Sequence, residues 1–291
     1  MSHPELQDEF EEYERQSREV RADVVLTTYA AGSGHPGSSF SSVELLVWLY
    51  NETLRVDPAE PDAPGRDRLV FSKGHASPAL YAVLSRQGFF ERSELFSLRE
   101  AGELLEGHAT DDVPGVEFSS GSLGQGLSFA VGTALGARMD GHDARAIAVL
   151  GDGELQEGQV WEAAMSAADR GLDNLVAVVE RNGVQNDDLT ADTKALGSVA
   201  KKFEAFGWHP TECDGHDFAS IQRAFEEVTD PTVDGPAVVV ADTEKGRGVS
   251  FMEETRLGYH SRVLSIEEIV TAFEELDVEH RLSDLKRCQS A

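Results

Sequence analysis

Cysteine and long apolar stretches are scarce in this chain. The two cysteines, Cys213 and Cys288, lie far apart and match no metal-binding or redox spacing, so we expect free thiols. No apolar stretch reaches the roughly 18 residues that a membrane-spanning helix needs. The amino terminus leads into charged residues and does not resemble a signal peptide. We therefore expect a soluble, cytoplasmic protein with no membrane partner.

Lysine is also scarce, while acidic residues are abundant. Lysine occurs at six positions, and 53 acidic residues outnumber 25 basic ones, for a formal net charge of −28. A surface this acidic and this poor in lysine suggests a host with high internal salt, where charge repulsion is screened. An ordinary acidic cytosolic protein is the alternative. Either way, the charge makes nucleic acid an unfavourable partner.

Short apolar runs alternate with stretches of helical periodicity through most of the 291 residues. The apolar runs predict strands at residues 69–71, 145–150, 174–180, 208–213 and 236–241. The periodicity predicts helices at residues 5–30, 43–50, 78–87, 93–101, 124–139, 157–169, 196–206, 218–228 and 266–276, and in the tail to Cys288. This order predicts an α/β fold with a mostly parallel sheet flanked by helices. Since no repeat or linker divides the chain, we expect residues 1–291 to form one domain.

Two polar residues follow neighbouring strands of this predicted sheet. Asp152 comes just after the apolar run 145–150, and Asn182 comes 30 positions later, after the run 174–180. A right-handed crossover brings the carboxyl ends of both strands to the same edge of the sheet, so these side chains should converge. A carboxylate, an amide oxygen and a backbone carbonyl form an oxygen ligand set that suits Mg²⁺.

Glycines flank Asp152 in a Gly151-Asp-Gly153 turn before the helix predicted at 157–169. Glycine lets a diphosphate approach the main chain, and the amino end of a helix attracts anions. Alone, such a turn is weak evidence, because an ordinary tight turn has the same pattern. Together with Asn182 at this distance, it matches the magnesium and diphosphate signature of thiamine diphosphate enzymes.

Other motifs resemble, in the same order, the amino-terminal half of transketolase from about residue 15 to residue 265. They are Ser33-Gly-His-Pro-Gly37, Phe71-Ser-Lys-Gly-His-Ala76, Glu106-Gly-His108, Gly121-Ser-Leu-Gly-Gln-Gly126, the Asp152 block, Asp214-Gly-His-Asp217 and Lys245-Gly-Arg-Gly-Val-Ser-Phe251. The resemblance implies the thiamine diphosphate-binding fold, with thiamine diphosphate and Mg²⁺ as cofactors. A full-length transketolase continues with a pyrimidine-binding domain, whereas this chain stops at Ala291.

The same resemblance implies a group of catalytic histidines. His35, His75 and His108 each follow a glycine in a predicted loop, where the backbone can bring an imidazole to a ligand. By resemblance, His35 lies beside the thiazolium and the donor hydroxyl, His75 contacts the diphosphate and the substrate, and His108 exchanges protons with sugar oxygens. His260 matches the family's further active-site histidine more loosely.

Further cofactor contacts carry over by motif. The resemblance implies that Gly121 and Leu123 offer backbone contacts to the aminopyrimidine ring, that Gly153 lies against the diphosphate, and that Val184 gives its carbonyl to Mg²⁺. Glu157 resembles the acid that meets the partner subunit's catalytic glutamate. Its position in the first turn of a predicted helix is also one that the helix dipole favours for a carboxylate.

The resemblance therefore implies the amino-terminal subunit of a split transketolase. Such a subunit would transfer a two-carbon ketol unit from a ketose phosphate to an aldose phosphate, together with a separately encoded carboxy-terminal subunit, as an α₂β₂ assembly or around a homodimer core. The alternatives are the α-subunit of a 2-oxoacid dehydrogenase or decarboxylase, a deoxyxylulose phosphate synthase fragment, and a non-catalytic cofactor-binding interaction subunit.

Overall fold

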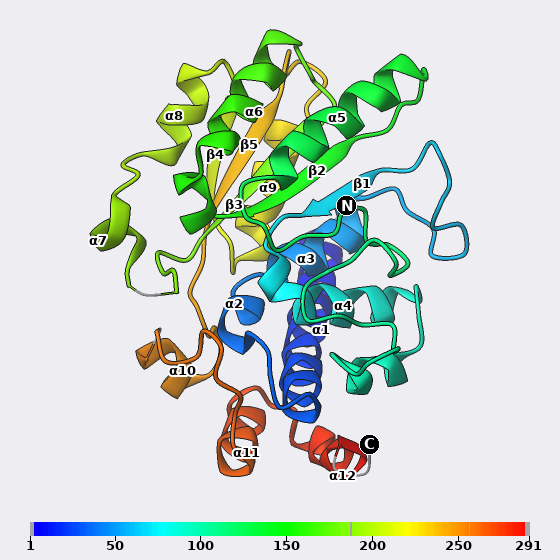
Figure 1. The fold of residues 1–291 in the computed structure, drawn as a ribbon, viewed down its shortest axis with the longest axis vertical. Helices are drawn as coiled ribbons and strands as arrows, with labels where there is room; N and C mark the ends of the chain where they lie inside the picture. The colour runs from blue at the N-terminus through cyan, green and yellow to red at the C-terminus, as the bar shows by residue number, and fades with distance from the viewer. Residues whose placement is uncertain (1–2, 187, 256, 289–291) are drawn as a thin grey trace.

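The centre of the fold is a five-stranded, all-parallel sheet in the order β1-β2-β3-β5-β4 (Figure 1). The computed structural model describes residues 3–186, 188–255 and 257–288. The strands are β1 (Arg68–Phe71), β2 (Ala146–Gly151), β3 (Leu175–Arg181), β4 (His209–Asp214) and β5 (Ala237–Asp242). Each predicted strand is present within two residues of its predicted bounds, which confirms the predicted α/β fold with a parallel sheet.

Helices cover both faces of this sheet. The longer ones are α1 (His3–Ala30), α4 (Ser77–Gln87), α5 (Gly126–Met139), α6 (Gly158–Asp169), α9 (Phe218–Val228) and α11 (Ile266–Glu275). The shorter ones are α2 (Pro36–Phe40), α3 (Val43–Trp48), α7 (Thr190–Lys194), α8 (Val199–Ala205), α10 (Ser250–Glu254) and α12 (Leu285–Cys288). In the described ranges, no helix is long and apolar enough to cross a membrane.

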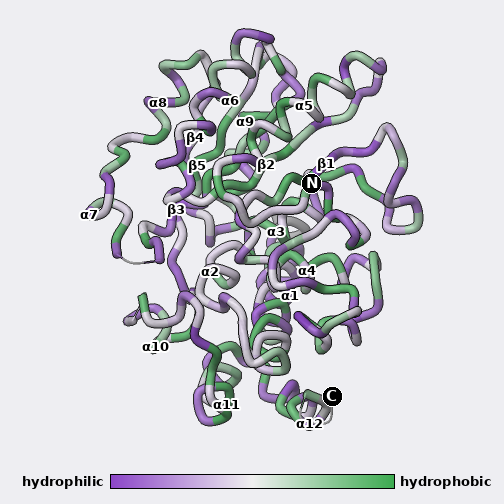
Figure 2. The backbone as a smooth tube through the Cα atoms, in the orientation of Figure 1, coloured by the Kyte–Doolittle hydropathy of each residue, from purple (hydrophilic) through white to green (hydrophobic). Residues whose placement is uncertain are grey.

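The sheet separates two hydrophobic layers. Green, hydrophobic backbone runs through the centre of the fold in Figure 2. Ile147 and Val149 of β2 face the layer that contains α1, α3, α4 and α9. Ala148 and Leu150 face the layer of α5, α6 and α8. Successive side chains of a strand point to opposite faces, so a strand covered by helices on both sides is apolar throughout. That is why these strands appear in the sequence as continuous apolar runs.

A buried ionic cluster holds the carboxy-terminal segment to α1. The carboxylate of Asp23 is buried and accepts hydrogen bonds from Arg86 at 2.9 Å, from Arg92 at 2.9 Å and from Arg281. Arg281 lies in a 3₁₀ turn, Glu279–Asp284, just before α12. A buried carboxylate is tolerated when it is fully paired in this way, so the cluster joins segments that are far apart in sequence.

Two predicted helices differ from the structure. The stretch 93–101 forms only a 3₁₀ turn, Arg92–Ser97, and Arg99 then takes a positive φ of 66° that a helix cannot continue. The tail forms the 3₁₀ turn Glu279–Asp284 followed by the short α12 rather than one amphipathic helix. The short helices α2, α7 and α10 were not predicted from the sequence, because they are too short to show periodicity.

Candidate functional site

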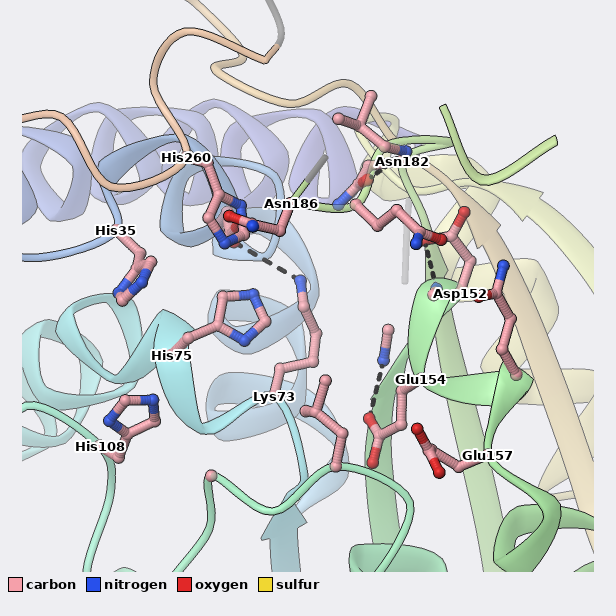
Figure 3. A pocket seen from close by; sticks show the side chains of 18 residues that line it. His35, Lys73, His75, His108, Asp152, Glu154, Glu157, Asn182, Asn186 and His260 are labelled. Carbon is pink, nitrogen blue, oxygen red and sulfur yellow. Dashed lines mark hydrogen bonds between the residues drawn. The ribbon is translucent and has the colours of Figure 1, made fainter. Parts of the chain in front are cut away.

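A cavity of about 400 Å³ lies where β1, β2 and β3 end (Figure 3). All the site residues predicted from the sequence line it: His35, His75, His108, Gly121, Leu123, Asp152, Gly153, Glu157, Asn182, Val184 and His260. The remaining lining residues are Ser38, Lys73, Gly151, Glu154, Gln156, Gln185 and Asn186. Ligands of parallel α/β sheets bind outside the carboxyl ends of the strands, and this cavity is in that position.

Four histidines from separate loops form one wall of the cavity. The ring of His35 lies 5.5 Å from that of His75, 6.0 Å from that of His108 and 5.2 Å from that of His260, measured between ring centroids. His75 lies in the 3₁₀ turn Gly74–Ala76, just before α4. The structure therefore brings together histidines that are up to 225 positions apart in the sequence.

Burial and neighbouring positive charges keep the imidazoles of His35, His75 and His108 neutral. Burial, followed by the charges that His260 and His108 would carry, lowers the pKa of His35 to about 4. Burial also lowers the pKa of His75 well below its usual range, and burial together with Arg99 lowers that of His108. A neutral imidazole has one donor and one acceptor nitrogen. At neutral pH this wall can both give and take hydrogen bonds from hydroxyl groups.

Arg99, which was not predicted as a site residue, adds a positive charge beside the histidine wall. Its guanidinium donates a hydrogen bond to Ser33 Oγ at 2.7 Å. A Cβ placed on Gly107 would come within 2.2 Å of Arg99 Nε, so the side chain lies against the loop that carries His108. Arg99 is exposed and presents a planar cation suited to phosphate or carboxylate.

Asp152 and Asn182 lie on the opposite wall, as the strand order predicted (Figure 3), and Val184 lines the cavity next to Asn182. Asp152 accepts hydrogen bonds from the backbone of Gly153 at 2.9 Å and of Gly183 at 3.1 Å. The side-chain oxygen of Asn182 accepts from the backbone N–H of Val184 at 2.9 Å. Burial, and next the charge of Glu180, raises the pKa of Asp152 to about 6. A nearby cation would favour the charged form of this carboxylate.

The donor set fits Mg²⁺ with open positions. Across residues 3–186, 188–255 and 257–288, no three His, Cys, Asp or Glu side chains are grouped to hold a metal ion by themselves. Asp152 would supply one carboxylate to such an ion, and the other ligands would then be an amide oxygen, a backbone carbonyl, water or phosphate. Mg²⁺ is usually bound in this way, through one or two carboxylates together with substrate phosphates.

Two buried lysines that were not predicted as site residues lie at the site: Lys73 lines the cavity, and Lys245 contacts His260 of its wall. Lys73 Nζ donates to Ser42 Oγ at 2.8 Å and to the carboxylate of Glu180. Lys245 Nζ lies 3.0 Å from His260 Nδ1. Burial, followed by the charge of Lys73, lowers the pKa of Lys245 to about 8, which leaves it mostly protonated at neutral pH. Both lie within motifs that match the family, and lysine occurs at six positions in the chain. This rarity of lysine could have identified the two as site residues.

A glycine-rich loop closes one end of the cavity. A Cβ on Gly121 would lie 3.2 Å from the ring of His108, and one on Gly124 would lie 2.6 Å from Cβ of Glu157. Leu123 and Glu157 are exposed at this rim. The buried carboxylate of Glu154 accepts a hydrogen bond from Gly124 N at 2.8 Å and so holds the loop in place.

Fold and site together define a thiamine diphosphate-binding domain, with a parallel sheet whose carboxyl edge carries a Gly-Asp-Gly turn opposite a wall of histidines. The profile of the family "Transketolase, thiamine diphosphate binding domain" matches residues 14–282. The chain therefore belongs to the transketolase family, as the sequence motifs indicated.

Curated relatives include separate subunits and full-length enzymes. The chain is 39% identical over 277 residues to a subunit of the apulose-4-phosphate transketolase of Phocaeicola vulgatus, covering 95% of this chain and 97% of the relative. It is 41% identical over 249 residues to 6-deoxy-6-sulfo-D-fructose transketolase subunit SqwG of a Clostridium species, covering 85% and 90%. It is 39% identical over 246 residues to human transketolase, covering 84% of this chain and 39% of the human enzyme.

Solved structures show the same fold. The transketolase of Campylobacter jejuni superimposes with a TM-score of 0.85 at 27% identity, covering 96% of this chain and 48% of that one. The Leishmania mexicana enzyme gives a TM-score of 0.83 at 26% identity, with coverage of 96% and 45%. The chain thus spans about half the length of these solved transketolases.

Proposed function

We propose that this chain is the diphosphate- and magnesium-binding subunit of a two-subunit transketolase. It would transfer a two-carbon ketol unit from a ketose phosphate to an aldose phosphate, with thiamine diphosphate and Mg²⁺ as cofactors. The observation that carries this proposal is the single cavity in which neutral histidines face Asp152 and Asn182. Relatives named as individual transketolase subunits match the chain over nearly their whole length, which supports a separately encoded partner.

The cofactor would be held at the wall that contains Asp152. The side-chain oxygens of Asp152 and Asn182 and the carbonyl of Val184 would bind Mg²⁺, and Gly153 would lie against the diphosphate. Lys245 and the N–H groups of the Gly-Asp-Gly turn would offset the remaining phosphate charge. When bound, thiamine diphosphate supplies the carbon nucleophile that takes up the two-carbon unit.

The histidine wall would handle protons at the sugar oxygens. Because His35, His75 and His108 have lowered pKa values, each would be neutral at neutral pH and could donate a hydrogen bond to one sugar oxygen and accept one from another hydroxyl. Arg99 lies beside them and would attract the phosphate of the sugar. This many hydroxyl-binding groups suits a polyhydroxylated substrate better than a 2-oxoacid.

The partner subunit would cover the rim at Leu123 and Glu157 and the adjoining outer surface of α5 and α6. That surface exposes large apolar side chains: Phe129 and Met139 of α5 and Met165 of α6 are 41%, 77% and 55% exposed. We propose that Glu157 meets a glutamate of the partner there, in an α₂β₂ assembly or around a homodimer core of this chain.

The test is ketol transfer from xylulose 5-phosphate to ribose 5-phosphate with the purified chain, with the partner subunit, and with both. We expect turnover only on mixing, and only with thiamine diphosphate and Mg²⁺ present. A 2-oxoacid donor serves as the comparison substrate. Full turnover by the chain alone would refute the two-subunit proposal, and turnover of the 2-oxoacid but not of the ketose phosphate would refute the proposed reaction.

A further inference from the structure

Glu180 is a buried charged residue behind the metal-site wall. It lies on β3 two residues before Asn182, and its side chain is fully buried. Asn182 follows the last residue of β3, Arg181, and its side-chain Nδ2 lies 3.0 Å from Glu180 Oε2. Asn182 lines the cavity whereas Glu180 does not. Glu180 is therefore behind Asn182 and has no direct access to a ligand.

The two carboxylate oxygens of Glu180 have different partners. Oε2 accepts a hydrogen bond from Asn182 Nδ2 at 3.0 Å and another from the ammonium of Lys73. Oε1 accepts a hydrogen bond from the hydroxyl of Thr243. On its other side, the amide of Asn182 accepts from Val184 N at 2.9 Å through Oδ1. Both ends of this amide are therefore specified by a partner.

We propose that Glu180 is a positioning residue that fixes the amide of Asn182 with its oxygen toward the metal site, an inference that rests on the proposed magnesium site. The oxygen and nitrogen ends of an asparagine amide are nearly equal in size, but only the oxygen can bind Mg²⁺. An ionised carboxylate only accepts hydrogen bonds, so Glu180 attracts the NH₂ end. The ammonium of Lys73 balances the buried charge of Glu180.

The test uses a pair of double variants that differ only in the orienting acceptor. Lys73→Met/Glu180→Gln removes the ion pair but keeps an amide oxygen that Asn182 Nδ2 can reach. Lys73→Met/Glu180→Met removes the ion pair and the acceptor at similar side-chain volume. Neither leaves an unpaired buried charge at these positions, so both should fold. Near-UV circular dichroism checks this.

Mg²⁺ is titrated calorimetrically into the chain and partner at saturating thiamine diphosphate. We expect the Lys73→Met/Glu180→Met variant to bind Mg²⁺ about 10- to 100-fold more weakly than the Lys73→Met/Glu180→Gln variant, as is usual when a residue behind a metal ligand is lost. Equal affinities in the two folded variants would overturn the role of Glu180. If unmodified protein showed no Mg²⁺ binding, the proposed metal site itself would fail.

Asn182→Asp provides a second test that leaves Lys73 and Glu180 in place. An added carboxylate is a better Mg²⁺ ligand in general, but here it would face Glu180 without a hydrogen to donate. We therefore expect weaker Mg²⁺ binding than in the unmodified protein. Equal or tighter binding by Asn182→Asp would overturn the proposal even if the double variants failed to fold.

Discussion

Glu44 offers a pH-dependent test of how the loop behind the cavity is held. This buried carboxylate on α3 pairs with Arg21 at 2.7 Å and lies 2.9 Å from His216 Nδ1. His216 Nε2 accepts a hydrogen bond from the backbone N–H of Glu244 at 2.8 Å. The proton of the neutral ring is therefore on Nδ1, which donates a hydrogen bond to Glu44. Glu44 thus anchors the residue that precedes Lys245 of the site.

The magnitude follows from the pKa of Glu44. Burial by itself raises this pKa, but the charge of Arg21 and the hydrogen bond from His216 outweigh burial and hold it at about 2, against a usual 4.5. A lowered pKa stabilises the fold above pH 4.5, and the contribution is lost as the pH falls toward 2. The full contribution is about 3 kcal/mol, of which about 1.4 kcal/mol is lost by pH 3.5.

The assay is urea denaturation of the unmodified chain and Glu44→Gln between pH 7 and pH 3.5. Glu44→Gln should be less stable by about 3 kcal/mol at pH 7, since it leaves Arg21 buried without a counter-charge. This difference should shrink by about 1.4 kcal/mol at pH 3.5. Glu162→Gln, at an exposed position of α6, is the control and should match the unmodified chain. A difference between Glu44→Gln and the unmodified chain that stays constant with pH would refute the reasoning.

Three further predictions concern metal, salt and partner. Asp152→Ala should remove Mg²⁺-dependent thiamine diphosphate binding, measured by calorimetry, and leave the fold largely intact, because this carboxylate serves the ligand. The melting temperature of the chain should rise steeply as KCl approaches molar levels, because salt screens repulsion within a net charge of −28. Phe129→Glu should weaken assembly with the partner subunit in analytical ultracentrifugation by placing a charge on the exposed surface of α5.

Each of these predictions has an outcome that would contradict it, and the two that use variants also have a control variant. Asp143→Ala, at a fully exposed carboxylate, is the control and should bind thiamine diphosphate normally. Undiminished affinity of Asp152→Ala for thiamine diphosphate would refute the role of Asp152 at the metal site. A melting temperature that does not change with KCl would favour the alternative, an ordinary acidic protein. Ile266→Glu, at an exposed apolar position of α11, should assemble normally, and unchanged assembly of Phe129→Glu would place the partner on another surface.

Much of the fold and of the site follows from local patterns. The apolar runs before Asp152 and Asn182 predicted β2 and β3, because a strand buried on both faces needs apolar side chains at every position. The right-handed crossover then required the two residues to converge, as they do. Helix ends were less predictable. The stretch 93–101 has helical periodicity, but the chain turns at Arg99, whose φ is positive and whose backbone N–H donates to the carbonyl of Leu105 at 2.8 Å.

The sequence by itself determined the class of fold, the family and many of the residues that line the cavity, since glycine turns, strand ends and ordered motifs are local features of the chain. Only the tertiary structure decided which side chains support them. Glu180 pairs with Lys73, which lies 107 residues earlier in the sequence, and His216 contacts Glu44, which lies 172 residues earlier. A buried charge is stable only with a partner at contact distance. Which residue becomes that partner depends on how the strands and helices pack, and this packing cannot be read from a local sequence pattern.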